Sequence, residues 1–348
     1  DAGSNTANIF YVDSASVSVG DDGVVRYTLM VKTGGGATNV SFEGIRCDTR
    51  ELAEMKGNWY DSRVGRLIQQ TLRDLPKLSD AIAASYFAPP RIVGVVGHDF
   101  RDRDRNKLAK RGIDLDGLLT DSSGRTFSWR GRYHENYNRR DTEDLQLNVF
   151  EHFKPVLGEA HRATPFVMLG NIRPDLQLDV LNQLSAPRFV LADTIDIWIE
   201  TQRDKLGEVM RRADLLVVND TESAKLTGES NVIVAGRALR KHGCKTVIIK
   251  KGEHGAVLFH EEGLFALPAF PVTDLRDPTG AGDSFAGALL GYLASAGTTD
   301  FASIKQAMVY GTAVASLTVE AFSTDRLAKA GCREIRARRK ELLKLIKA

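Results

Sequence analysis

The first part of the chain alternates apolar and polar side chains, from Asn8 to Cys47 in NIFYVDSASVSVGDDGVVRYTLMVKTGGGATNVSFEGIRC. Alternation with a period of two is typical of strands that bury one face. The turn signals GDDG and TGGG separate the alternating runs. The pattern therefore predicts three antiparallel strands joined as hairpins, with TGGGATNVS as a hairpin turn.

The pattern changes between residues 60 and 80. The stretch SRVGRLIQQTLRDL, from Ser62 to Leu75, has apolar residues at helical spacing, so it predicts a connecting helix. Beyond it, short apolar runs alternate with helix-compatible stretches. These runs are RIVGVVG, PFVMLGN, RFVLAD, DLLVVND and KTVIIKKG. Runs of this kind are buried in parallel sheets, and the alternation predicts a layered α/β domain. The basic, amphipathic C-terminal stretch REIRARRKELLKLIKA predicts a docked surface helix.

The composition favours a folded protein and gives no sign of nucleic-acid binding, membrane insertion or a disulfide framework. The 348 residues are 43% hydrophobic and 26% charged, which is typical of a folded chain with a sizeable core. Lys and Arg (47) nearly balance Asp and Glu (45), so the charge gives no reason to expect nucleic-acid or membrane-surface partners. No apolar run reaches the roughly 18 residues of a membrane helix. Three distant cysteines form neither a disulfide framework nor a metal-ligand spacing, which favours a reducing, cytoplasmic setting.

The stretch DPTGAGDSFAGALLGYLA, starting at Asp277, carries the strongest chemical signal. Its apolar periodicity predicts a helix from about Ala281. Small residues at a helix N-terminus let an anion approach the unpaired backbone N–H groups. Asp283 lies directly behind them, where a carboxylate can take a proton from an attacking hydroxyl. A glycine-rich turn that only allows close helix packing, with Asp283 as an ordinary first-turn acid, explains the spacing equally well.

The same stretch resembles the C-terminal signature of the pfkB family of carbohydrate and nucleoside kinases, which have the ribokinase-like fold. Four more stretches resemble family elements in the same order, and the matches together cover about Ala81 to Leu327. They are RIVGVVGHDF, VVNDTESAKLTGE, VIIKKGEHGAVLF and MVYGTAVASLTVE. The resemblance implies a three-layer α/β/α domain with a mainly parallel sheet and a small β lid. The expected organisation is a β-rich segment (1–60), a helical connector (61–80) and a ribokinase-like domain (81–348) with a lid insert at about 117–150.

The resemblance also implies a reaction, in which a phosphoryl group passes from ATP to a hydroxyl group of a sugar or nucleoside. Asp283 would be the general base, the backbone of Gly280, Ala281 and Gly282 the anion hole, and Thr279 part of the turn. ATP and Mg²⁺ are the implied cofactors, and the family likeness allows a monovalent cation as well. The implied nucleotide contacts are Asn219, Glu222, Lys250, Gly252, Gly255, Gly311 and Thr312, of which Asn219 and Glu222 would also reach the metal through water.

Acceptor contacts are less sharply defined. The stretch from Gly124 to Phe153 is dense in aromatic and arginine side chains, and in the family this region supplies the lid and part of the acceptor pocket. Arg140 is a candidate acceptor contact, with Arg132, His134 and Asn138 beside it, but solvated strand residues fit each position too. Asn171 lies at the end of a predicted strand. We expect it either to contact the acceptor or the phosphate, or to cap a helix. A homodimer through the lid is a further expectation.

The front of the chain departs from the family. Members open with a strand that carries an acceptor-binding aspartate, followed by a Gly-Gly motif that would fall near Asp74 and Leu75, where the chain has no glycine. The first sixty residues instead resemble the cryptic neisserial protein-like family. Three hypotheses follow: an active kinase in which Asp13 or the Gly34–Gly36 turn completes the acceptor site, a nucleotide-binding protein without transfer activity, or a β-module that binds a partner.

Overall fold

The computed structural model describes residues 9–19, 24–32, 38–46, 51–53, 68–72, 78–133 and 140–346, with side chains from residue 78 onward except 132–141. Its contacts divide the chain into two units. One combines residues 1–71 with 129–145, and the other combines 72–128 with 146–348. Each unit is described by itself.

The first unit contains the predicted hairpins. Strands β1 (Ile9–Val19), β2 (Val24–Lys32), β3 (Thr38–Arg46) and β4 (Glu51–Ala53) form an antiparallel sheet in that order. The three expected strands are confirmed, and β4 is an addition that the alternation did not predict. Lys32 lies opposite Thr38, so β2 and β3 form the hairpin predicted around TGGG, although the turn residues themselves lie outside the described residues.

The predicted connector helix is wrong where the structure describes it. Ile68–Leu72 forms strand β5, which joins β8 (Ser128–Tyr133) and β9 (Arg140–Gln146) in a three-stranded sheet. The segment IQQTL contains the β-branched residues Ile68 and Thr71, which fit a strand. Pairing with β8 supplies inter-strand hydrogen bonds that a short helical period cannot outweigh.

The second unit is built on a six-stranded sheet with the order β10-β11-β12-β13-β14-β15. The first four strands pair in parallel and the last two pairings are antiparallel, so the sheet is mainly parallel as expected. The strands are β10 (Phe166–Leu169), β11 (Phe189–Asp193), β12 (Leu215–Asn219), β13 (Thr246–Lys250), β14 (Ala256–His260) and β15 (Gly263–Leu267). A separate parallel pair consists of β6 (Arg91–Gly97) and β7 (Asp114–Asp121). All five apolar runs singled out in the sequence are strands.

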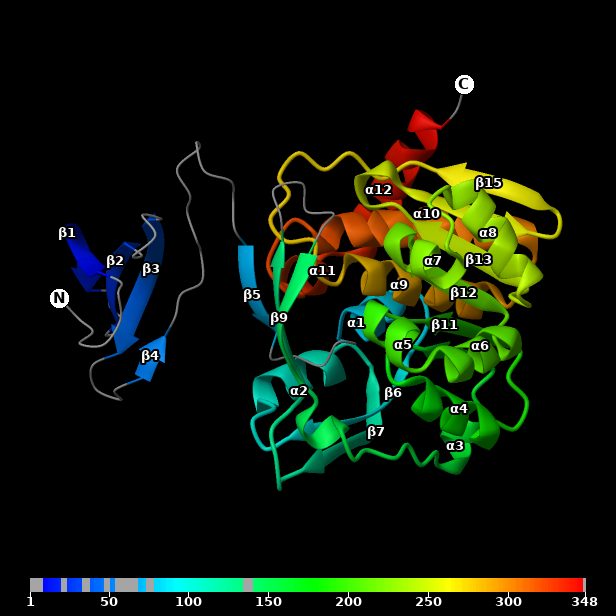
Figure 1. The fold of residues 1–348 in the computed structure, drawn as a ribbon, viewed down its shortest axis with the longest axis horizontal. Coiled ribbons are helices and arrows are strands. Elements are labelled where there is room, and N and C mark those ends of the chain that lie inside the picture. The colour runs from blue at the N-terminus through cyan, green and yellow to red at the C-terminus, as the bar shows by residue number, and fades with distance from the viewer. Residues whose placement is uncertain are drawn as a thin grey trace. The chain divides into compact units, whose positions relative to one another are not determined.

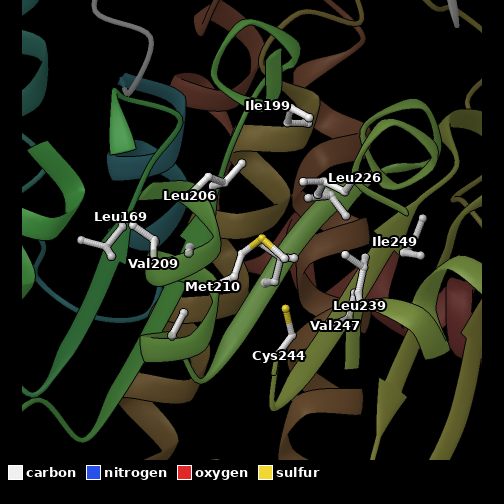
Figure 2. Close-up of a cluster of buried hydrophobic side chains, with 14 of the residues drawn as sticks. Leu169, Ile199, Leu206, Val209, Met210, Leu226, Leu239, Cys244, Val247 and Ile249 are labelled. Carbon is white, nitrogen blue, oxygen red and sulfur yellow. The ribbon is translucent and has the colours of Figure 1, made fainter. Parts of the chain in front are cut away.

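Helices cover both faces of the six-stranded sheet (Figure 1). Because side chains alternate along a strand, Val190 and Ala192 of β11 enter one buried cluster, while Phe189 and Leu191 enter the other. Figure 2 shows the first cluster, which helices α4, α5, α6, α7 and α8 close. These helices are α4 (Pro174–Gln183), α5 (Asp196–Thr201), α6 (Arg203–Arg212), α7 (Asp220–Thr227) and α8 (Val232–Lys241).

The opposite face is covered by α9 (Ala281–Ala296), α10 (Phe301–Thr318) and α12 (Cys332–Leu345). Ile335 and Leu342 of α12 are buried, which confirms the docked C-terminal helix. The remaining helical segments are α1 (Leu78–Ala84), α2 (Asp102–Ala109), α3 (Glu159–Arg162), α11 (Asp325–Lys329) and the single turns Asn148–Phe150 and Gly252–His254. The result is the three-layer α/β/α architecture. Over the described residues, we find no helix with the length and apolar character that a membrane crossing needs.

Helix α9 packs against α1 through glycine. A Cβ at Gly287 would collide with the backbone of Asp80, and one at Gly291 would lie 2.8 Å from the carbonyl oxygen of Ala84. Glycine at both positions therefore lets the two helix backbones approach closely. This contact fixes the helix whose N-terminus carries the predicted chemistry.

Candidate active site

The carboxyl ends of four parallel strands present polar side chains along one edge of the sheet. Asp193 ends β11, Asn219 ends β12 and Lys250 ends β13, while Asn171 follows β10 by two residues. Open α/β sheets bind ligands at this edge. The buried side chain of Gln177 holds two of the strand ends in place, because its Nε2 donates to the carbonyl oxygens of Gly170 (2.7 Å) and Asp193 (3.0 Å).

The loop before α9 is held by a buried carboxylate. Asp277 is fully buried, and its side chain accepts hydrogen bonds from the backbone N–H groups of Thr279 (3.0 Å) and Ser323 (3.4 Å). Its own N–H donates to the carbonyl oxygen of Val319. Thr279 therefore lies in the turn, as expected, and the segment after α10 anchors that turn.

Gly280 then gives the chain the geometry that starts α9. Its φ of 80° lies in the left-handed region, and a Cβ there would lie 2.7 Å from Ser79 Oγ. The helix begins at Ala281 and carries Asp283 in its first turn. Asp283 is partly exposed. Among the three predicted anion-hole residues, Ala281 donates its N–H to the carbonyl oxygen of Pro278. This N–H group is therefore already used within the turn.

Lys250 meets the start of α9. A Cβ on Gly282 would lie 2.9 Å from Lys250 Nζ, so the ammonium group packs against the first turn of the helix. The positive end of a helix dipole does not favour a cation, so an anion placed between the ammonium group and the helix start would be stabilised by both. The Oδ1 atom of Asp193 lies 4.0 Å from Nζ, and the two side chains are only 4% and 19% exposed, respectively. Asp193 therefore places a buried negative charge near the lysine.

Asn219 and Glu222 form a reciprocal capping box at the start of α7. Asn219 Oδ1 accepts from the Glu222 N–H and Glu222 Oε2 accepts from the Asn219 N–H, each at 2.8 Å. Glu222 is buried. Across the described part of the chain, no three His, Cys, Asp or Glu side chains come together as a direct metal site.

The family follows from comparison with known proteins. The model of the pfkB family carbohydrate kinases matches residues 81–330. The chain belongs to this family. A second model, that of the CNP1-like family, matches residues 1–71, which agrees with the other resemblance seen in the sequence.

Relatives of the pfkB-family region act on different acceptors. The chain is 38% identical over 124 residues to the cytidine kinase of Thermococcus kodakarensis, covering 34% of this chain and 44% of the relative. It is 38% identical over 122 residues to the aminoimidazole riboside kinase of Salmonella typhimurium, covering 34% and 38%. The matched regions thus span less than half the length of these two relatives.

Solved structures support the fold. A putative ribokinase II from E. coli, in complex with ATP and Mg²⁺, superposes with a TM-score of 0.64 at 21% identity, over 76% of this chain and 88% of that chain. The ribokinase-like fold predicted from the motifs is therefore confirmed for the second unit.

Several residues predicted to contact the nucleotide in this pfkB-family chain also shape a turn or a contact between helices. Gly255 has φ 88°, and a Cβ there would collide with the carbonyl oxygen of Leu267. Gly252, with φ 54°, accepts from the Gly255 N–H, so the pair forms the turn between β13 and β14. Gly311 brings α10 close to Phe285 of α9, and the neighbouring Thr312 is buried. Their contact with nucleotide stays a prediction.

Of the residues predicted to contact the acceptor, the structure describes the side chain of Asn171 alone. Asn171 is partly buried, and its carbonyl oxygen accepts from Trp198 Nε1 at 3.1 Å. Arg140 begins β9 and Arg132 lies in β8, but their side chains, like His134 and Asn138, lie outside the described residues. The same holds for the Gly34–Gly36 turn, for Asp74 and Leu75, and for the side chain of Asp13.

Sequence reasoning missed Asp193. The residue ends the strand FVLAD, and its position at the carboxyl edge of a predicted parallel strand was the available signal. Asp277 was named only as the start of the motif. Its role in holding the turn depends on Val319 and Ser323, which lie more than forty residues away in sequence, so no local pattern could reveal it.

Proposed function

We propose that the chain transfers a phosphoryl group from ATP to a hydroxyl group of a sugar or nucleoside. The observation that carries this proposal is the meeting of Lys250 Nζ with the N-terminus of α9, directly beside Asp283. Phosphoryl transfer depends on positioning and on charge stabilisation more than on covalent chemistry, and this arrangement offers both.

In this mechanism the acceptor oxygen forms a bond to the γ-phosphorus while the bond from that phosphorus to the β,γ-bridging oxygen breaks. Asp283 takes the proton of the acceptor hydroxyl. The first turn of α9 at Gly280–Gly282 and the ammonium of Lys250 balance the charge on the transferred group and on the leaving ADP. Asp193 keeps Lys250 in place through its buried carboxylate.

Asn219 and Glu222 would hold magnesium through water. The bound ion would neutralise phosphate charge. A monovalent cation is part of the proposal on family likeness alone, and comparing K⁺ with Na⁺ in the transfer assay tests it. A cytoplasmic setting agrees with the free thiols of Cys244 and Cys332.

A second candidate function is nucleotide binding without transfer. It is favoured by the boundary between the two family matches, because the kinase match starts at residue 81 while the CNP1-like match covers residues 1–71. The first strand and its acceptor aspartate would thus fall in the region that matches another family, and the expected Gly-Gly position near Asp74 and Leu75 falls between the two matches.

Transfer of the γ-phosphate of ATP into a mixed pool of sugars and nucleosides separates these functions. We expect Asp283→Asn to lower transfer about 100-fold or more while ATP still binds. Glu261→Gln, which changes an exposed carboxylate in the β14–β15 turn, should leave transfer unchanged. A folded chain that binds ATP but shows no transfer would establish the second function, and one that binds no ATP would overturn both.

A further inference from the structure

A cavity of about 310 Å³ opens on one face of the β6–β7 pair, and none of its lining residues belongs to the candidate active site. Its apolar wall consists of Val93, Leu119, Phe153 and Val156. Leu119 and Val156 are 54% and 76% exposed, although both are apolar. Exposed apolar side chains gathered around a hollow commonly mark a binding surface.

A β-bulge directs a carboxylate to this cavity. Arg91 pairs with Asp114 but Val93 pairs with Gly117, so β7 contains one extra residue between the two pairs. Bulges re-aim side chains and occur often beside functional sites. Here the bulge contains Asp116, an exposed residue that lines the cavity.

Glycine lets β7 and α3 approach each other at the cavity. A Cβ at Gly117 would lie 2.6 Å from the carbonyl oxygen of Ile92 and 3.1 Å from Nε2 of His161. That imidazole nitrogen is buried and has no hydrogen-bond partner among the described residues. Buried polar atoms are normally paired, so this nitrogen is an exception, and the imidazole ring that carries it lines the cavity.

The charge around the cavity is negative. Asp116 and Glu159 both line it and both are exposed, and neither forms an ion pair within the described residues. Arg91, which contacts the lining residue Ala160, already has partners. Its Nε pairs with Asp114 at 3.2 Å and its Nη1 donates to the carbonyl oxygen of Ala160 at 3.1 Å. The lining therefore combines an apolar wall, two carboxylates and the imidazole ring of His161.

We propose that this cavity binds a small organic cation with an apolar body, such as an arylalkylammonium. The body would pack on Val93, Phe153 and Val156 while the ammonium group faces Asp116 and Glu159. The volume matches the lower range of small-molecule sites. An anion of the same shape would meet two carboxylates and be repelled.

The test uses the full chain and three probes of similar shape: phenethylammonium, phenethyl alcohol and phenylacetate. We expect calorimetry to show that phenethylammonium binds more tightly than the alcohol and that phenylacetate does not bind. The double variant Asp116→Asn, Glu159→Gln should weaken phenethylammonium binding about tenfold or more and leave the alcohol unchanged. Both positions are exposed, so the variant is expected to fold, and its far-UV circular dichroism checks this.

Two further variants locate the site. Val156→Lys places an ammonium group at the exposed cavity mouth and should compete with the bound cation, whereas Glu341→Gln on α12 removes an exposed carboxylate elsewhere and should have no effect. Equal affinity for the cation and the alcohol, or binding that survives both Val156→Lys and the double variant, would overturn the proposal. So would the absence of phenethylammonium binding to the folded native chain.

Discussion

At the scale of single residues, Lys250 is the side chain on which the candidate anion site depends. Its ammonium group is mostly buried, touches the start of α9 and is balanced by Asp193. Replacing it with methionine keeps most of the length of the side chain and removes the charge. The change should affect both ATP binding and stability. A bound phosphate would lose a cation, and Asp193 would lose a positive charge near its carboxylate.

We expect Lys250→Met to weaken ATP binding about 10- to 100-fold, because a charge-assisted contact is lost. The free energy of unfolding should fall by about 1–3 kcal/mol, because the buried Asp193 carboxylate loses its balance. Isothermal titration and urea denaturation measure the two effects. Lys110→Met, at an exposed position after α2, is the control and should change neither. Unchanged ATP affinity in Lys250→Met would remove this lysine from the proposed site.

The cysteines give a second prediction at this scale. Burial raises the pKa of the Cys244 thiol to about 12, whereas Cys332 is exposed at the start of α12. At pH 8 only about one Cys244 thiol in 10⁴ is ionised, and the thiolate is the reactive form. Pulse labelling with iodoacetamide, read by peptide mass spectrometry, should modify Cys332 in the native chain and Cys244 only after unfolding. Equal labelling rates in the native chain would contradict the burial of Cys244.

At the scale of elements, the cap of α7 combines a structural and a functional expectation. Asn219 caps the helix through a hydrogen bond to the Glu222 N–H, and we also propose it as a magnesium contact through water. The chain offers a matched control in α8, where Asn231 accepts from the N–H groups of Ile233 and Val234. Both asparagines are N-caps, but only Asn219 lies at the carboxyl edge of the parallel strands.

Each asparagine-to-alanine change should lower the free energy of unfolding by about 1 kcal/mol, the usual contribution of such a cap. Only Asn219→Ala should also weaken binding of ATP in the presence of magnesium. Urea denaturation and titration of both variants provide the comparison. Equal ATP affinity in the two would leave Asn219 with its capping role alone.

The same scale shows what the sequence could predict. Strands such as β11 and β12 were predictable, because a continuous apolar run bounded by polar residues has few alternatives in an α/β chain. Strand β5 was not predictable, because its five residues also fit a helical period. Pairing with β8 favours the strand over the helix. The start of α9 was predictable from Gly280 and the apolar run after it. The contact between Lys250 and Gly282 was not predictable from spacing, because it joins segments thirty residues apart.

At the scale of the whole molecule, the division into two units has a thermodynamic consequence. The proposed ATP contacts all lie in residues 72–128 and 146–348, whereas the CNP1-like region lies in the other unit. A ligand raises the stability only of the unit that binds it, by about 2.7 kcal/mol when its concentration is 100 times Kd. Units with separate cores commonly unfold in separate transitions.

We therefore expect differential scanning calorimetry of the full chain to show two transitions, of which magnesium and ATP raise only one. The Lys250→Met variant, at the same ATP concentration, should show a smaller rise in that transition because its affinity is lower. The other transition then serves as an internal control for effects of salt and magnesium. A single transition that shifts as a whole with ATP would mean that the CNP1-like region is energetically coupled to the nucleotide site. Such coupling would favour the active kinase, because a replaced acceptor region that completes the site would contact the unit that binds the nucleotide.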